Sequence, residues 1–277
     1  RLSSGRLHRQ HRRTSPANYL LQVNKYYSNG KLLLTGEYAV LDGALSLAIP
    51  TTYGQSLSIK EIDPQKLVWR SRDEKGSIWF EHTFDINIFS TNIEDGYIKG
   101  FDPISQTLHK ILVEAKKLNP AFLNGTKGLE VETQLDFPRE WGLGTSSTLI
   151  NNIAQWAQVD AYELLWSTLG GSGYDIACAQ YNTPILYRLT NGRPYIEEIK
   201  FDPPFKTNLF FIHLNKKQNS REGISNYREK KFDKTKLIAE VSSITKEILS
   251  CTRLSQFEAL IEAHENLIAK TLNLPTV

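Results

Sequence analysis

The stretch PREWGLGTSSTLINN, residues 138–152, joins a strand pattern to a helix pattern through a turn that contains two glycines. Gly142 and Gly144 allow the backbone to turn tightly, and the Thr-Ser-Ser of residues 145–147 opens the expected helix. The free N–H groups and the positive dipole end of such a helix attract anions. The stretch predicts either an anion site or an ordinary serine-capped helix, and its spacing is neither that of a Walker P-loop nor that of a Rossmann fingerprint.

Strand and helix patterns follow one another irregularly on both sides of this turn. Before the turn we expect a β-rich opening over 26–62, a hairpin over 66–84 with its turn at 73–76, a helix over 103–118 and a strand over 128–137. After Gly144 we expect a helix of about 14 residues, a helix over 160–169 and a hairpin turning at 191–192. A strand from 208, a polar loop and two helices over 236–272 complete the expected order. A parallel doubly wound sheet requires regular β-α alternation, so this order predicts the α+β class.

Two further segments carry residues suited to chemistry. In NGKLLLTGEYAVLDG, residues 29–43, Lys31 begins an apolar strand, and Glu37 and Tyr38 follow a glycine at its end. Read alone, that segment is a strand and a turn with solvated charges. In GGSGYDIACAQ, residues 170–180, three glycines precede Asp175, which is either the cap of a short helix or a carboxylate presented to a bulky ligand.

Composition indicates an ordinary globular protein of 277 residues, with 40% hydrophobic and 23% charged residues. The basic excess lies in the first 24 residues, which hold five arginines and no acid, so that 28 basic and 30 acidic residues remain from Lys25 onward. The slightly acidic body argues against a nucleic-acid partner. No apolar run approaches the length of a membrane span, so we also expect no membrane partner.

The arginine- and serine-rich head has the composition either of a transit peptide or of extraneous residues, and we expect residues 1–24 to lie outside the fold. The sequence contains no methionine, which predicts that it is not a complete natural reading frame. Cys178 and Cys251 have no metal-like or redox-like spacing, and two small buried thiols agree with a reducing, cytoplasmic location.

Together, the three segments resemble the motifs of the GHMP kinase superfamily, the small-molecule kinases of galactose, homoserine, mevalonate and phosphomevalonate. GKLLLTGEYAVLDG (30–43) is similar to the first motif of the family, GLGTSS (142–147) to its phosphate-binding motif, and GSGYDIA (171–177) to its catalytic-aspartate motif. With AIPTTYGQSLSI (48–59) and LNKKQNSREGIS (214–225), the chain looks closest to the bacterial subgroup named for GYDIA, and the resemblance runs from about Lys25 to the end.

The resemblance implies an N-terminal ATP-binding domain over 25–195, like domain 2 of ribosomal protein S5, and a ferredoxin-like substrate-side domain over 196–277. It implies an ATP- and Mg²⁺-dependent kinase whose acceptor is mevalonate or phosphomevalonate. Asp175 and Lys31 would be catalytic and Ser146 would help to hold Mg²⁺. The residues implied to hold ATP are Gly142, Leu143, Gly144, Thr145, Ser146 and Ser147, and those implied to face the acceptor are Glu37, Tyr38, Gly173, Lys217 and Ser220.

Two departures from the family pattern are visible. Only 29 positions separate Ser146 from Asp175, and Glu163 is a candidate there for a metal ligand, although a capping role beside Asp160 explains it equally well. The chain also stops at LNLPTV (272–277), before the glycine-rich third motif of the family, which predicts a truncated C-terminal domain.

Two rival functions follow from other classes. A metabolite-sensing or binding protein on the same scaffold needs neither Lys31 nor Asp175, so the presence of both favours an enzyme. An S5-like domain also occurs in ribosomes, but the acidic body disfavours RNA binding. The oligomeric state is open at this stage.

Overall fold

The computed structural model describes residues 23–90, 97–214 and 220–273, and it omits the side chains of 220–222. Most of the predicted head therefore lies outside the described residues. Seven strands and seven α-helices occur in the described part of the chain, which confirms the predicted α+β class. The strands are β1 (Asn24–Leu33), β2 (Ser46–Ile62), β3 (Lys66–Arg72), β4 (Ile78–Asp85), β5 (Gly128–Leu135), β6 (Ile185–Thr190) and β7 (Arg193–Glu198).

The helices match the predicted order apart from α5, whose first residues fall in the expected polar loop. They are α1 (Pro103–Leu118), α2 (Thr145–Ala157), α3 (Ala161–Thr168), α4 (Tyr174–Gln180), α5 (Ser220–Glu229), α6 (Lys234–Leu249) and α7 (Leu254–Leu272). The Asp160 side chain accepts the N–H groups of Tyr162 and Glu163 at 2.7 and 3.0 Å, so the predicted cap of α3 is confirmed. Within the described residues, no helix is long and apolar enough to cross a membrane.

All seven strands belong to one mixed sheet in the order β4-β3-β5-β2-β6-β7, with β1 paired to β2. Among the described strands, only β3 and β5 pair in parallel, and the other pairs are antiparallel. Asn191 and Gly192 both have positive φ, as the two-residue hairpin turn between β6 and β7 requires. The predicted boundary between residues 195 and 196 falls inside β7, and the division into two domains stays a prediction.

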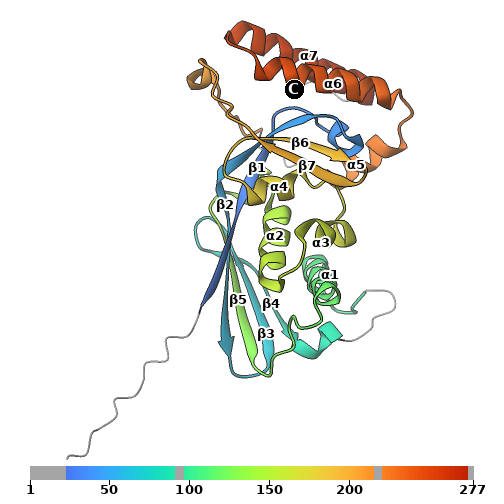
Figure 1. Ribbon diagram of the computed structural model, residues 1–277. Coiled ribbons are helices and arrows are strands. Elements are labelled where there is room, and N and C mark those ends of the chain that lie inside the picture. The colour runs from blue at the N-terminus through green and yellow to red at the C-terminus, as the bar shows by residue number, and fades with distance from the viewer. Residues whose placement is uncertain (1–22, 91–96, 215–219, 274–277) are drawn as a thin grey trace, which may run out of the picture.

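Helices α1, α2 and α3 cover one face of the sheet, while α6 and α7 lie together at the far end from the β3–β4 hairpin (Figure 1). Alternate residues of the strands face these helices, and the helices contribute their buried apolar side chains. Because both contributions are apolar, they form the largest core cluster, which includes Leu57, Leu67, Trp69, Phe84, Val131, Ile111, Leu112, Ile150, Ile153 and Leu164.

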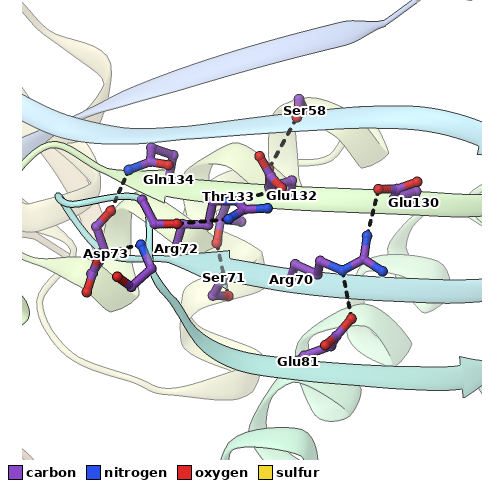
Figure 2. A network of polar contacts seen from close by, with 12 residues as sticks. Ser58, Arg70, Ser71, Arg72, Asp73, Glu81, Glu130, Glu132, Thr133 and Gln134 are labelled. Carbon is purple, nitrogen blue, oxygen red and sulfur yellow. Dashed lines mark hydrogen bonds and ion pairs between the residues drawn. The ribbon is translucent and has the colours of Figure 1, made fainter.

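The other face of the sheet carries charged side chains at the alternate positions. Arg70 on β3 contacts Glu81 on β4 at 2.6 Å and Glu130 on β5 at 2.7 Å, and Arg72 contacts Glu132 at 2.7 Å (Figure 2). These pairs are partly exposed, so each contributes less than about 1 kcal/mol, but together they match one register of the three strands.

The expected strand from residue 208 is wrong. Residues 209–214 have no strand assignment, because no neighbouring strand pairs with them in the described part of the chain. Leu209 packs against a core cluster that includes Phe205, but the apolar side chains after it are exposed, Phe210 at 80% and Ile212 at 81%. A β-prone sequence without a partner for its backbone groups does not form a strand.

Candidate active site

The first contact of the site joins β1 to the glycine turn that precedes α2. The backbone N–H of Lys31 donates to the carbonyl oxygen of Leu143 at 3.0 Å. Gly30 permits this approach, because a Cβ at that position would lie 2.8 Å from the same Leu143 oxygen. The β1–β2 register also shifts between Asn29 and Lys31, so the strand is bent where it meets the turn.

Two glycines determine the backbone conformation of the turn before α2. Gly142 and Gly144 have φ values of +72° and +91°, which other residues rarely adopt. Among the described residues, no side chain caps α2, and Ser146 in its first turn is exposed. The unpaired N–H groups of residues 145–147 therefore remain available to an anion. The buried Ser147 differs: its hydroxyl donates to the Gly144 carbonyl at 2.9 Å.

The Lys31 side chain lies against this turn. A Cβ added to Gly144 would lie 3.1 Å from Cγ of Lys31 and 2.8 Å from Oγ of Ser147. The Lys31 ammonium lies 5.5 Å from the centre of the Tyr174 ring, at the start of α4. Lys31 lies near the end of β1, which begins at Asn24, so the expectation that it begins a strand is wrong. From there its ammonium lies between the anion-binding turn and the segment of Asp175.

Asp175 occupies the first turn of α4, beside that cation. Gly173, with φ +87°, is the N-cap, and a Cβ there would lie 2.9 Å from the Tyr162 ring. Burial raises the pKa of the Asp175 carboxyl, whereas the Lys31 ammonium and hydrogen bonds from the backbone N–H groups of Asp175 and Ile176 lower it. The neighbouring Tyr174 hydroxyl and then the Asp175 and Glu37 carboxylates raise the pKa of Lys31 against its own desolvation.

The three predicted segments therefore meet in space. Helices α2 and α4 lie side by side next to β1 (Figure 1). This is an observation of geometry; the roles of the individual residues stay predictions. The arrangement offers an anion-binding helix end, a fixed ammonium and a carboxylate with a raised pKa, which is what phosphoryl transfer requires.

Glu37 and Tyr38 lie in the loop after β1, and the charge of Glu37 interacts with that of Lys31. Tyr38 has φ +56° and stacks on Tyr227 of α5, with the ring centres 5.9 Å apart. Although the Glu37 side chain is exposed, desolvation raises its pKa; Lys31 opposes this shift, and Glu265 of α7 adds to it.

Helix α5 approaches Tyr38 closely, because a Cβ at Gly223 would lie 2.5 Å from the Tyr38 hydroxyl. The predicted acceptor residue Ser220 begins this helix, but its side chain is not described. The predicted Lys217 lies outside the described residues.

Glu163 is exposed in the first turn of α3, where its N–H is held by Asp160. No hydrogen bond or ion pair joins Glu163 to Ser146 in the described ranges. Within the same ranges, no three His, Cys, Asp or Glu side chains lie close enough together to hold a metal ion. The role of Glu163 as a metal ligand stays a prediction.

Sequence reasoning missed His264 on α7. Its Nε2 accepts the backbone N–H of Gly36 at 2.9 Å, directly before Glu37, and burial lowers its pKa to about 4. Nothing in the local sequence of α7 signals this contact, because its partner lies 228 positions away. Asn151 and Asn152 were also missed, although two amides on the apolar face of a predicted helix are a usable signal of a buried polar contact.

Comparison with solved structures identifies the fold. A Methanococcus jannaschii mevalonate kinase matches with a TM-score of 0.63 and 16% identity over 94% of this chain and 82% of its own. A Streptococcus pneumoniae phosphomevalonate kinase, in complex with phosphomevalonate and AMPPNP, matches with a TM-score of 0.62 and 13% identity over 90% of this chain and 80% of its own. A Lactococcus lactis galactokinase complexed with galactose matches with a TM-score of 0.54 and 14% identity over 91% of this chain and 76% of its own.

No family model and no curated protein matches this sequence. At 13–17% identity the structural matches establish the fold, which is that of the GHMP kinases, as the three motifs predict. They do not distinguish one subgroup from another, because kinases of different acceptors match alike.

Proposed function

We propose that this chain, which has the GHMP kinase fold, is an ATP-dependent kinase that transfers the γ-phosphoryl group to a hydroxyl or phosphate oxygen of a small metabolite. One observation carries the proposal. Lys31 and Asp175, 144 positions apart in the sequence, lie together beside the uncapped start of α2. Positioned charges of this kind supply most of the catalysis in phosphoryl transfer.

With a hydroxyl acceptor, the transfer is a displacement at the γ-phosphorus. The acceptor oxygen attacks the γ-phosphorus, an O–P bond forms, and the bond from that phosphorus to the β–γ bridging oxygen breaks. ADP leaves with the electron pair, and the acceptor proton passes to the Asp175 carboxylate. Burial raises the pKa of this carboxyl, which makes it a better proton acceptor, while Lys31 keeps it ionised.

The start of α2 suits the phosphates of ATP. The N–H groups of residues 145–147 would donate to phosphate oxygens, and the Lys31 ammonium would offset their charge. The exposed Ser146 hydroxyl would help to hold Mg²⁺, with phosphate oxygens and water as the remaining ligands, as is usual for this ion. When bound, Mg²⁺ neutralises phosphate charge.

Mevalonate or phosphomevalonate is the acceptor that we propose. The support is the similarity of GEYAVLDG (36–43) to those branches of the family and the matches to solved mevalonate and phosphomevalonate kinases. A panel of mevalonate, phosphomevalonate, galactose and a heptose phosphate, each with Mg-ATP, tests this choice through the rate of ADP release. Turnover with galactose alone would refute the mevalonate assignment and leave the kinase proposal intact.

The decisive variant is Asp175→Asn, which removes the charge and keeps the shape. We expect turnover to fall by about two orders of magnitude or more, since general-base and charge effects are of that size. The affinity for Mg-ATP, measured by calorimetry, should stay within about twofold. Asp202→Asn is a matched control, because Asp202 is an exposed carboxylate that pairs with Lys206 outside the site. Unchanged turnover in Asp175→Asn would reject the catalytic role and favour a metabolite sensor.

A further inference from the structure

A network of buried polar side chains lies next to the elements that carry Lys31 and Asp175. Asn151 and Asn152, in the middle of α2, are 2% and 0% exposed, and Ser28 on β1 is 0% exposed. Both amides have hydrogen-bond partners at both ends. A buried amide that loses a partner is costly, so these side chains have defined orientations.

Asn151 connects two elements of the site through one side chain. Its Nδ2 donates to Oγ of Ser28 at 2.8 Å, and its Oδ1 accepts from Nε2 of Gln180 at 3.0 Å. Ser28 lies three residues before Lys31 on β1, and Gln180 lies at the end of α4, the helix that carries Asp175. The side chain thus contacts the strand that carries the ammonium and the helix that carries the carboxylate.

Asn152 makes equally good contacts, but only to the sheet. Its Nδ2 donates to the carbonyl of Gln55 on β2 at 2.8 Å, and its Oδ1 accepts from the hydroxyl of Ser28 at 2.8 Å. Neither partner lies on α4. The two neighbouring asparagines therefore match in residue type, burial and number of partners, and differ in whether they reach the aspartate helix.

We propose that Asn151 is a positioning residue, which fixes α4 against β1 and thereby holds the carboxylate of Asp175 in register with the ammonium of Lys31. The proposal rests on the proposed kinase function. It acts through the Ser28 and Gln180 contacts and involves no contact with a substrate. A displacement of about 1 Å between reacting groups is enough to slow an enzyme strongly.

The test compares Asn151→Ala, Asn152→Ala and Gln180→Ala. The first measurement is kcat and KM for Mg-ATP, with the acceptor that the panel identifies, well below the unfolding temperature of every variant. We expect Asn151→Ala and Gln180→Ala to lower kcat about five- to tenfold, the effect of one lost hydrogen bond, with KM for Mg-ATP within about twofold. Asn152→Ala should lower the unfolding temperature as much as Asn151→Ala and keep kcat within about twofold.

The double variant shows whether the two substitutions lower kcat through the same contact or independently of each other. Asn151→Ala with Gln180→Ala should be no slower than Asn151→Ala alone, because both substitutions remove the same contact. Gln180 is exposed, so its variant provides the test even where Asn151→Ala does not fold. Equal losses of kcat in Asn151→Ala and Asn152→Ala, or an unchanged kcat in Gln180→Ala, would overturn the proposal.

A second measurement needs no turnover. Hydrogen exchange of the α4 backbone amides should be faster in Asn151→Ala than in Asn152→Ala, because only the former releases that helix. If the wild-type protein phosphorylates no acceptor, the kinase proposal fails, and exchange still reports whether Asn151 holds α4. Equal exchange rates in the two variants would refute the positioning role itself.

Discussion

His264→Gln gives a quantitative test of how α7 holds the loop before Glu37. The neutral imidazole accepts the N–H of Gly36 through Nε2, and burial lowers its pKa from 6.5 to about 4. Because this pKa is lower in the folded chain than in the unfolded one, the unfolded chain binds the proton more tightly. The stability contributed by neutral His264 is full above pH 6.5 and is lost as the pH falls toward 4.

The expected magnitude follows from that difference in pKa. At about 1.4 kcal/mol per unit, the fall from 6.5 to about 4 corresponds to about 3 kcal/mol. Glutamine offers an uncharged acceptor and does not titrate, so His264→Gln should lose about 3 kcal/mol less stability than wild type between pH 7.5 and 4.

The assay is urea unfolding of both proteins at half-unit pH steps. The two proteins differ only at position 264, so the contributions of their other side chains cancel in the difference. A difference in unfolding free energy that stays constant over this range, or that changes in favour of wild type at low pH, would refute the reasoning.

Two glycine predictions test the close approaches at the site. Gly30→Ala should destabilise the fold by about 1–3 kcal/mol and weaken Mg-ATP binding, because its Cβ would lie 2.8 Å from the Leu143 oxygen. Gly125→Ala is the control, since nothing lies within 4 Å of its Cβ, and equal unfolding midpoints for the two variants would contradict this reading. Gly223→Ala should raise KM for the acceptor and leave KM for Mg-ATP unchanged, because its Cβ would press on the Tyr38 hydroxyl at 2.5 Å; an equal rise in both constants would disprove a local effect.

Local patterns were sufficient for most elements of the fold. The apolar period of 103–118 and the turn residues at 73–76 and 191–192 predicted α1 and the two hairpins, because these depend on nearby residues. The expected strand from 208 failed for the opposite reason. Strand formation depends on a partner that the local sequence does not specify, and the described chain provides none. Helix α5, which contains the Gly223 that meets Tyr38, was likewise not predicted.

The sequence by itself determined which groups the candidate site contains: an anion-binding turn at 142–147, the ammonium of Lys31 and the carboxylate of Asp175. Only the tertiary structure decided that they meet, through Gly30 against Leu143 and through Asn151 between Ser28 and Gln180. It also decided that His264 supports the loop before Glu37. The physical reason is the distance along the chain over which each feature is determined. Helix starts and turns depend on residues next to them in the sequence, whereas a pKa or a hydrogen bond between residues a hundred or more positions apart depends on how the chain packs.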